Sequence, residues 1–166
     1  MSRPPDALAE LTARHRPEIA RYLVRLVGDA DEAEDVCQEV FLRAHRAFDR
    51  LAPDSNARAW LYRIATNSGL NAVRGRARRV AHTADVEVDG IASGDGASPE
   101  RRAELRAVVR AVQGLPPRQR AALVLRQWEG LGYAEIAGVL GGNEAAARAN
   151  VYQAIRRLRL VLGGPQ

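Results

Sequence analysis

The sequence predicts an all-α protein made of two small helical domains joined by a flexible acidic linker, the second a four-helix domain with a helix-turn-helix. Apolar residues recur at helical spacing over nearly the whole chain, and no segment alternates as a strand does. Residues 82–99 instead hold four acidic residues, three glycines and no arginine, which is typical of a linker. We therefore predict domains over residues 1–80 and 100–166, with the linker over 81–99.

The composition favours a nucleic-acid partner over a catalytic or membrane role. The chain carries a formal net charge of +5, and all 25 of its basic residues are arginine, the residue that binds phosphates and guanine edges in bidentate fashion. A GC-rich genome would also explain the missing lysine. No apolar run is long enough to span a bilayer and no signal peptide is evident, so we expect a cytoplasmic protein without membrane insertion.

Metal, cofactor and catalytic sites are not expected. The single cysteine, Cys37, excludes an internal disulfide and a multi-cysteine zinc site, and the three histidines lack metal-ligand spacing. Cys37 is better explained as a small buried apolar residue than as a redox site. No glycine-rich phosphate loop or nucleophile motif is present, so we expect neither a cofactor nor catalysis.

The first domain should contain three helices. Apolar spacing predicts a helix, or pair of helices, over residues 7–27, which Gly28 and the following aspartate end. A second helix is predicted over 31–50, with Val36, Val40 and Ala44 on its buried face and its acidic residues pointing elsewhere. The turn-forming run at 52–56 separates it from a third helix over 57–79.

The third helix has a polar stripe suited to DNA. The segment 56–79 contains six arginines and no acidic residue. At 100° per residue, four of its side chains fall within an arc of about 60°, with Trp60 on the same stripe, and these four are Asn67, Asn71, Arg74 and Arg78. Asparagine can bond a base edge, arginine a phosphate, and tryptophan can stack on a base. The alternative is a solvated polar face with Trp60 in the core.

The second domain should end in a DNA-binding helix. Helices are predicted over 100–113, from the prolines at 116–117 to Gly130, over 133–140, and over 144–162. Recognition helices contact bases with their N-terminal half. We therefore expect four outward residues of the last helix to face bases, namely Arg148, Ala149, Tyr152 and Gln153. Arg156 and Arg157 should contact phosphates, and Asn150 is a further outward residue expected to bind DNA. A solvated arginine-rich helix is the alternative.

Three blocks in this order resemble the bacterial RNA polymerase sigma factors of the sigma-70 family, of the extracytoplasmic-function (ECF) type. The blocks "DEAEDVCQEVFLRAHRAFDRL" and "WLYRIATNSGLNAVRGRARR" are similar to the family's region 2. The block "LPPRQRAALVLRQWEGLGYAEIAGVLG" and the basic helix after it are similar to region 4.

The resemblance implies an alternative sigma factor that binds core RNA polymerase, recognises the −35 and −10 promoter elements and promotes DNA melting. The block that contains Asp35, Gln38, Glu39, Phe41 and Arg43 would dock on the β′ clamp helices of the polymerase, and its β flap is a further implied partner. Asn67 matches the family asparagine near the flipped base of the −10 element, and the loop 52–57 matches the pocket for that base. An anti-sigma factor is a further implied partner.

Two other functions remain open from the sequence. One is a stand-alone helix-turn-helix repressor or activator whose first domain dimerises or binds an effector. The other is an accessory nucleic-acid-binding protein without sequence specificity. The stripe at 60–78 and the "DVCQEVF" block have no role in the repressor, which favours the sigma factor.

Overall fold

The described part of the chain is all-α, as predicted. The computed structural model describes Pro4, residues 6–80 and residues 96–163, so most of the predicted linker lies outside it. Over the described ranges the chain forms seven α-helices and one short 3₁₀-helix, with no strand. None of the helices in these ranges is long and apolar enough to cross a membrane.

Three helices form the first lobe, α1 (Ala7–Val27), α2 (Ala30–Ala47) and α3 (Ala57–Val80). The Asp29 side chain accepts the Glu32 N–H at 2.8 Å at the start of α2, and Asn56 accepts the Ala59 N–H at 3.0 Å at the start of α3. The second helix is shorter than predicted, because its last turn is the separate 3₁₀-helix η1 (Phe48–Arg50).

The first lobe is held by an apolar core between its helices. Its fully buried side chains include Leu23, Val40 and Leu61, one from each helix. Cys37 is also fully buried, as predicted, and burial raises the pKa of its thiol, which keeps it in the unreactive protonated form.

Four helices form the second lobe, α4 (Pro99–Gln113), α5 (Pro117–Gln127), α6 (Tyr133–Leu140) and α7 (Glu144–Leu162). Prolines begin α4 and α5, where a missing N–H costs nothing. The Asn143 side chain accepts the Ala146 N–H at 2.8 Å at the start of α7. Gly141 and Gly142, both with positive φ, make the turn between α6 and α7 that the sequence predicts.

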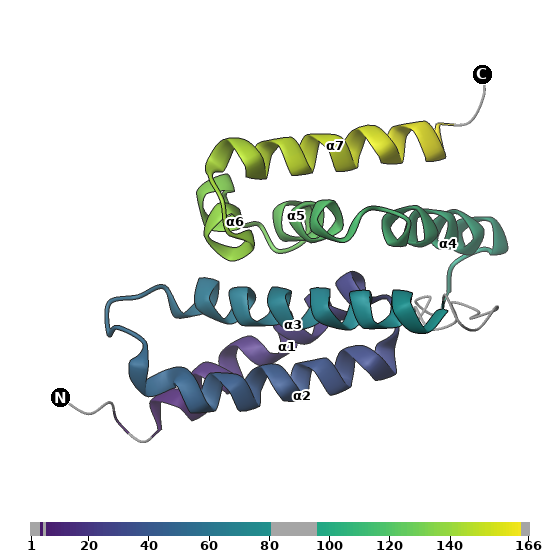
Figure 1. The fold of residues 1–166 in the computed structure, drawn as a ribbon. Helices are drawn as coiled ribbons and strands as arrows, with labels where there is room; N and C mark the ends of the chain where they lie inside the picture. Colours follow the sequence, from purple (N-terminus) through teal and green to yellow (C-terminus); the bar gives the residue numbers. More distant parts are fainter. Residues whose placement is uncertain (1–3, 5, 81–95, 164–166) are drawn as a thin grey trace.

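The helices lie in three layers, and the two lobes pack against each other (Figure 1). The first lobe forms one layer, α4, α5 and α6 form the middle layer, and α7 lies on the outside. Buried residues from both lobes belong to one continuous apolar cluster, which includes Leu26 and Leu70 of the first lobe and Ile136 of the second.

The second lobe caps the C-terminal end of α1. The last four carbonyl groups of a helix have no partner within the helix. For residues 24–27 the donors are, in order, Gly28 N, Gln113 Nε2, Arg120 Nη1 and Arg76 Nη1, at 2.8, 2.6, 2.7 and 2.7 Å. Two of these four donors, Gln113 and Arg120, belong to the second lobe, so protein groups satisfy the whole end of α1 only when the lobes are together, and water must replace two of them when they part.

Gly28 lets the second lobe approach this helix end. It has a φ of +84°, which favours glycine, and a Cβ there would lie 2.3 Å from the Gln113 Oε1 atom. A larger residue would therefore push Gln113 away from the helix end.

Arg120 is the buried cation of this contact. Its side chain is 6% exposed and also donates from Nη2 to the carbonyl groups of Gln113 and Leu115, at 2.6 and 3.1 Å. Burial, with the nearby charge of Arg76, lowers the pKa of Arg120 to about 10, so the guanidinium remains charged at neutral pH.

We predict that Arg120→Ala lowers the free energy of unfolding by about 2–4 kcal/mol, because it leaves three buried carbonyl groups without their donor. The control is Arg118→Ala, which also removes a guanidinium from helix-end carbonyls, those of Leu140 and Gly141, but at an exposed site within one lobe. Urea unfolding followed by circular dichroism measures both. Equal losses for the two variants would contradict the role given to Arg120.

Candidate functional site

The outward face of α2 carries the polar residues predicted to bind polymerase. Asp35, Gln38, Glu39 and Arg43 are all exposed, and the opposite face of the helix packs into the core. Glu39 and Arg43 pair at 2.6 Å one turn apart, so this face presents both charges side by side.

An apolar depression lies beside this polar face, between α1 and α2. Phe41, the fifth predicted residue, is only 9% exposed and lies under the guanidinium of Arg16, whose Cζ is 5.5 Å from the ring centroid. Leu42 is 58% exposed at the rim and Leu8 lines the same depression. An apolar centre with a polar rim is the usual composition of a protein–protein interface.

The predicted stripe on α3 is solvent-accessible. Asn67, Asn71, Arg74 and Arg78 are exposed, and the Arg74 Nη2 atom donates to the Asn71 Oδ1 atom at 2.9 Å. This bond leaves the Asn71 amide nitrogen free to donate to a base edge. Trp60, at the start of the stripe, is half-buried, and its ring centroid lies 6.3 Å from that of Phe48. One side of the ring therefore packs against the core, while the residue still belongs to the stripe.

The loop that precedes α3 is open to solvent. Residues 52–56 are exposed and border the N-terminal end of the stripe. The Asn56 side chain caps α3, so it is committed to starting the helix. The remaining loop residues are those available to contact a ligand.

The outer face of α7 is exposed over its whole length. Ala147, Val151 and Ala154 are buried against the rest of the second lobe, and Ile155 and Leu158 on the same face are partly buried. Six of the seven predicted DNA-binding residues are exposed and Asn150 is partly buried; the six are Arg148, Ala149, Tyr152, Gln153, Arg156 and Arg157. Together with α6 and the glycine turn, this helix has the geometry of a helix-turn-helix.

Comparison with known proteins identifies the family. Residues 11–79 match the family Sigma-70 region 2, and residues 105–158 match Sigma-70, region 4. The chain is 38% identical over 154 residues to the RNA polymerase sigma-H factor of Pseudomonas aeruginosa, covering 87% of this chain and 80% of that protein. It is 33% identical over 160 residues to the sigma factor CarQ of Myxococcus xanthus, covering 95% and 90%.

The chain belongs to the sigma-70 family of RNA polymerase sigma factors. It is of the ECF type, since it is also 33% identical to the ECF sigma-E factor of Escherichia coli over 87% of this chain and 80% of that protein. It is an alternative sigma factor, which recognises promoters and initiates transcription.

Two solved structures share this fold. The sigma factor RpoE of Bartonella quintana, in complex with the anti-sigma factor NepR, matches with a TM-score of 0.78 and 24% identity over 97% of this chain and 99% of that one. CnrH, in complex with the cytosolic domain of CnrY, matches with a TM-score of 0.73 and 25% identity over 98% and 92%.

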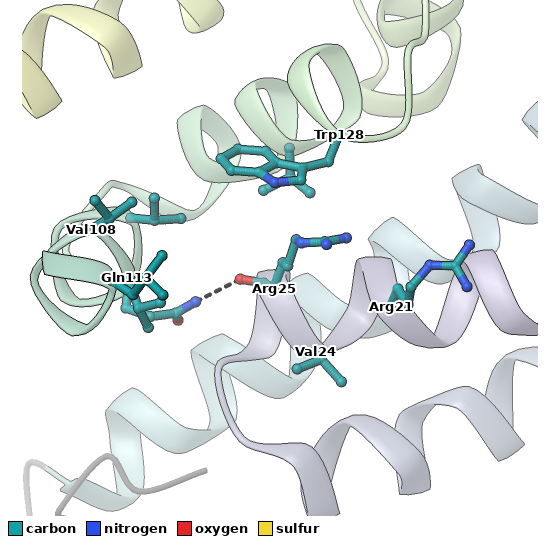
Figure 2. A pocket seen from close by; sticks show the side chains of 10 residues that line it. Arg21, Val24, Arg25, Val108, Gln113 and Trp128 are labelled. Carbon is teal, nitrogen blue, oxygen red and sulfur yellow. Dashed lines mark hydrogen bonds between the residues drawn. The ribbon is translucent and has the colours of Figure 1, made fainter. Parts of the chain in front are cut away.

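The sigma factor has an apolar groove between its lobes (Figure 2). It has a volume of about 410 Å³ and is formed by α1, α4 and α5. Val24, Val108 and Trp128 lie on its walls, with Val108 37% and Trp128 46% exposed. Arg21 and Arg25 line its α1 side, so the groove combines an apolar floor with positive charge.

A polar socket in the first lobe receives Glu129 of the second. The Glu129 side chain is 6% exposed and its Oε1 atom lies 3.5 Å from Arg25. Its Oε2 atom lies 2.8 Å from the Tyr62 hydroxyl, and Arg58 donates to its backbone carbonyl at 3.0 Å. The Tyr62 hydroxyl also lies 3.0 Å from Glu18, so its one proton is shared between two carboxylates.

The socket holds its charges through mutual hydrogen bonds. Burial alone would raise the pKa of Glu18, but hydrogen bonds from Arg58, His15 and Tyr62 lower it overall, so the carboxylate remains ionised. Burial and the two carboxylates raise the pKa of the Tyr62 hydroxyl far above its usual value, so it stays a donor.

The sequence prediction missed the residues that join the lobes. Arg58 and Tyr62 lie on α3 outside the predicted stripe, and Gln113, Arg120 and Glu129 lie far along the chain from their partners. No periodic pattern relates them, so no sequence signal would have found them. Exposed Leu42 was also missed, although an apolar residue on the polar face of α2 is visible in the pattern.

We call the arrangement in which the two lobes pack against each other the closed arrangement. We predict that Tyr62→Phe weakens it by about 1–3 kcal/mol, because Glu129 loses a hydrogen bond at a site from which water is largely excluded. The radius of gyration from small-angle X-ray scattering should increase. The control is Tyr22→Phe, which removes a buried hydroxyl bonded to Thr66 at 2.7 Å within the first lobe. That variant should lose stability and keep its radius; the same radius in both variants would show that Tyr62 does not hold the lobes together.

Proposed function

We propose that this sigma factor binds core RNA polymerase through α2 and places α3 on the −10 element and α7 on the −35 element. The observation that carries the proposal is that one chain presents three separate exposed faces, one of mixed charge beside an apolar depression and two rich in arginine. The protein would act without catalysis of its own, in the cytoplasm, where the polymerase works.

The α2 face would bind the β′ clamp helices of the polymerase. Asp35, Gln38, Glu39 and Arg43 would supply its polar contacts, and Phe41 would support the helix from the core side. Leu42, exposed next to the depression, would supply the apolar centre of that interface. The β flap would bind the second lobe.

The α3 stripe would stabilise single-stranded −10 DNA. Asn67 and Asn71 would bond the edge of a flipped base, and Arg74 and Arg78 would neutralise the backbone on the same stripe. Extruding a base costs a few kcal/mol of lost stacking, so the contacts of the loop and stripe must offset that cost.

The α7 face would enter the major groove of duplex −35 DNA. Arg148, Ala149, Tyr152 and Gln153 on its N-terminal half would face the bases, with Asn150 beside them. Arg156 and Arg157, a turn further on, would contact phosphates, which adds affinity without sequence preference.

The closed arrangement is too short to place both faces on one promoter. The −35 and −10 elements are about 25 base pairs apart, or about 85 Å at 3.4 Å per base pair. A compact chain of this length has a radius of gyration of about 15 Å and a diameter of about 40 Å. The lobes must therefore separate when the protein acts with polymerase, which breaks the contacts of Arg120 and Glu129.

An anti-sigma factor is the partner that the interlobe groove would suit. RpoE and CnrH, which share this fold, were each solved with a second protein bound. An amphipathic helix with acidic residues would match the apolar floor and the two arginines on the α1 side. Because the groove walls come from both lobes, such a partner would favour the closed arrangement.

Run-off transcription with purified core polymerase tests the proposed function. We expect promoter-dependent transcripts only when this protein is added. Specific binding of duplex DNA by the protein alone, with no effect on the polymerase, would support a stand-alone regulator instead.

A matched pair of variants tests the two protein interfaces. Leu42→Glu should weaken core polymerase binding at least tenfold, since it places a charge at the apolar centre of the α2 interface. Val108→Glu makes the same kind of change in the groove and should bind core polymerase normally, while raising promoter activity in the native host by escaping an anti-sigma factor. Size-exclusion chromatography and a promoter reporter measure the two effects.

We predict that Asn67→Ala impairs promoter opening more than promoter binding, because its base contact forms only after the −10 base is extruded. Permanganate footprinting should show at least a fivefold loss of open complex. Gel shifts under conditions that favour the closed complex should change less than twofold. Equal losses at both steps would argue against a contact with the flipped base.

A further inference from the structure

Tyr133 links α6 to α5 and α7 through two stacked arginines, one from each of those helices. It is the first residue of α6, and two guanidinium carbons lie close to its ring centroid, that of Arg126 at 4.2 Å and that of Arg148 at 4.4 Å. Both distances are within the range of a cation–π interaction. Arg126 also donates to the Leu131 carbonyl at 3.2 Å, so it belongs to the scaffold of the lobe.

Arg148 is held on two sides although it is exposed. Its Nη2 atom donates to the Glu144 Oε1 atom at 3.0 Å one turn earlier on α7, while its face lies over Tyr133. Its other N–H groups have no hydrogen-bond partner within the described ranges. A guanidinium stacked on a ring keeps its N–H edge in the plane of the group, free for a ligand.

This arrangement differs from an ordinary surface ion pair. Arg101 and Glu104 on α4 form a comparable exposed pair at 3.3 Å, but no ring covers that guanidinium in the structure as described. An exposed pair alone restrains an arginine weakly. The stacking on Tyr133, from a different helix, fixes the direction of Arg148 relative to the whole helix-turn-helix.

We propose that Tyr133 and Glu144 are positioning residues that hold Arg148 toward the edge of a guanine in the −35 duplex. This rests on the proposed function of α7. Arginine is the side chain that bonds the O6 and N7 atoms of guanine in bidentate fashion, and Arg148 lies in the N-terminal half of α7, where base contacts are made. A restrained arginine loses less conformational freedom on binding and tolerates fewer orientations of the base.

The test measures sequence preference with the reconstituted holoenzyme. Fluorescence anisotropy gives the affinity for duplex promoter fragments in which each −35 base pair is replaced in turn. Arg148→Ala should remove a preference for guanine of roughly 5- to 100-fold at one position. Tyr133→Leu should reduce the same preference severalfold at that position only, and Tyr133→Phe, which keeps a ring, should retain it. Arg101→Ala should change nothing.

A double-variant comparison separates positioning from general packing. In the Arg148→Ala background, Tyr133→Leu should cause no further loss of preference, because the residue it positions is gone. An equal additional loss in that background, or a uniform loss across all sequences, would overturn the proposal. A uniform loss with Arg148→Ala and a shallower salt dependence would place Arg148 on a phosphate and would overturn it too.

Glu144→Gln keeps the test valid if Tyr133→Leu does not fold. It should lower the guanine preference two- to fivefold without altering the thermal midpoint by more than a few degrees, and an unchanged preference would remove Glu144 from the proposal. Failure of the proposed function is distinguishable, since wild-type holoenzyme would then show no −35 preference at any position.

Discussion

The end of α1 is the point on which the closed structure depends. A helix end has four carbonyl groups that need outside donors, and here the second lobe supplies two of them through Gln113 and Arg120. Gly28 makes room for this approach, and Arg120 brings a positive charge into the contact between the lobes. The apolar cluster that runs through both lobes closes around these bonds, so packing and hydrogen bonding require the same relative position.

The socket for Glu129 adds a second, differently built contact. It consists of charged side chains that satisfy one another, whereas the α1 contact consists of side chains that satisfy backbone. Both must break if α3 and α7 are to occupy separate promoter elements. Under the proposed function, the free energy of closure would set how much binding energy polymerase must supply, and a partner in the interlobe groove would add to that requirement.

The sequence predicted the parts of the fold that depend on local pattern. The ends of the helices were predicted to within a few residues, because apolar spacing, capping residues and glycine turns are local features of the sequence. Cys37 is buried as predicted, and the residues predicted to point outward from α7 are exposed except for partly buried Asn150. Most of the predicted site residues lie on exposed faces, except for buried Phe41 and partly buried Trp60 and Asn150, and their roles stay predictions.

Contacts between distant segments could not be predicted in this way. In the sequence, nothing distinguishes Tyr62 from any other aromatic residue on a predicted helix. Its hydroxyl meets Glu129 only in the folded structure. Tyr133 likewise shows its relation to Arg148 only when α6 and α7 are placed side by side. Helical periodicity gives the face on which a residue lies, but not what another element brings to that face.

Arg120 and Gln113 bond to main-chain oxygen atoms, and this determines how the joint between the lobes can change during evolution. Substitutions at Arg25 or Leu26 leave the main-chain carbonyl groups in place, so a change of side chain there does not remove the acceptors of Gln113 and Arg120. An insertion or deletion within α1 would instead shift the point at which the helix stops. The main-chain acceptors of the joint are thus insensitive to side-chain identity in the first helix and sensitive to its length, whereas the salt bridge of Arg25 and the packing of Leu26 still depend on their side chains.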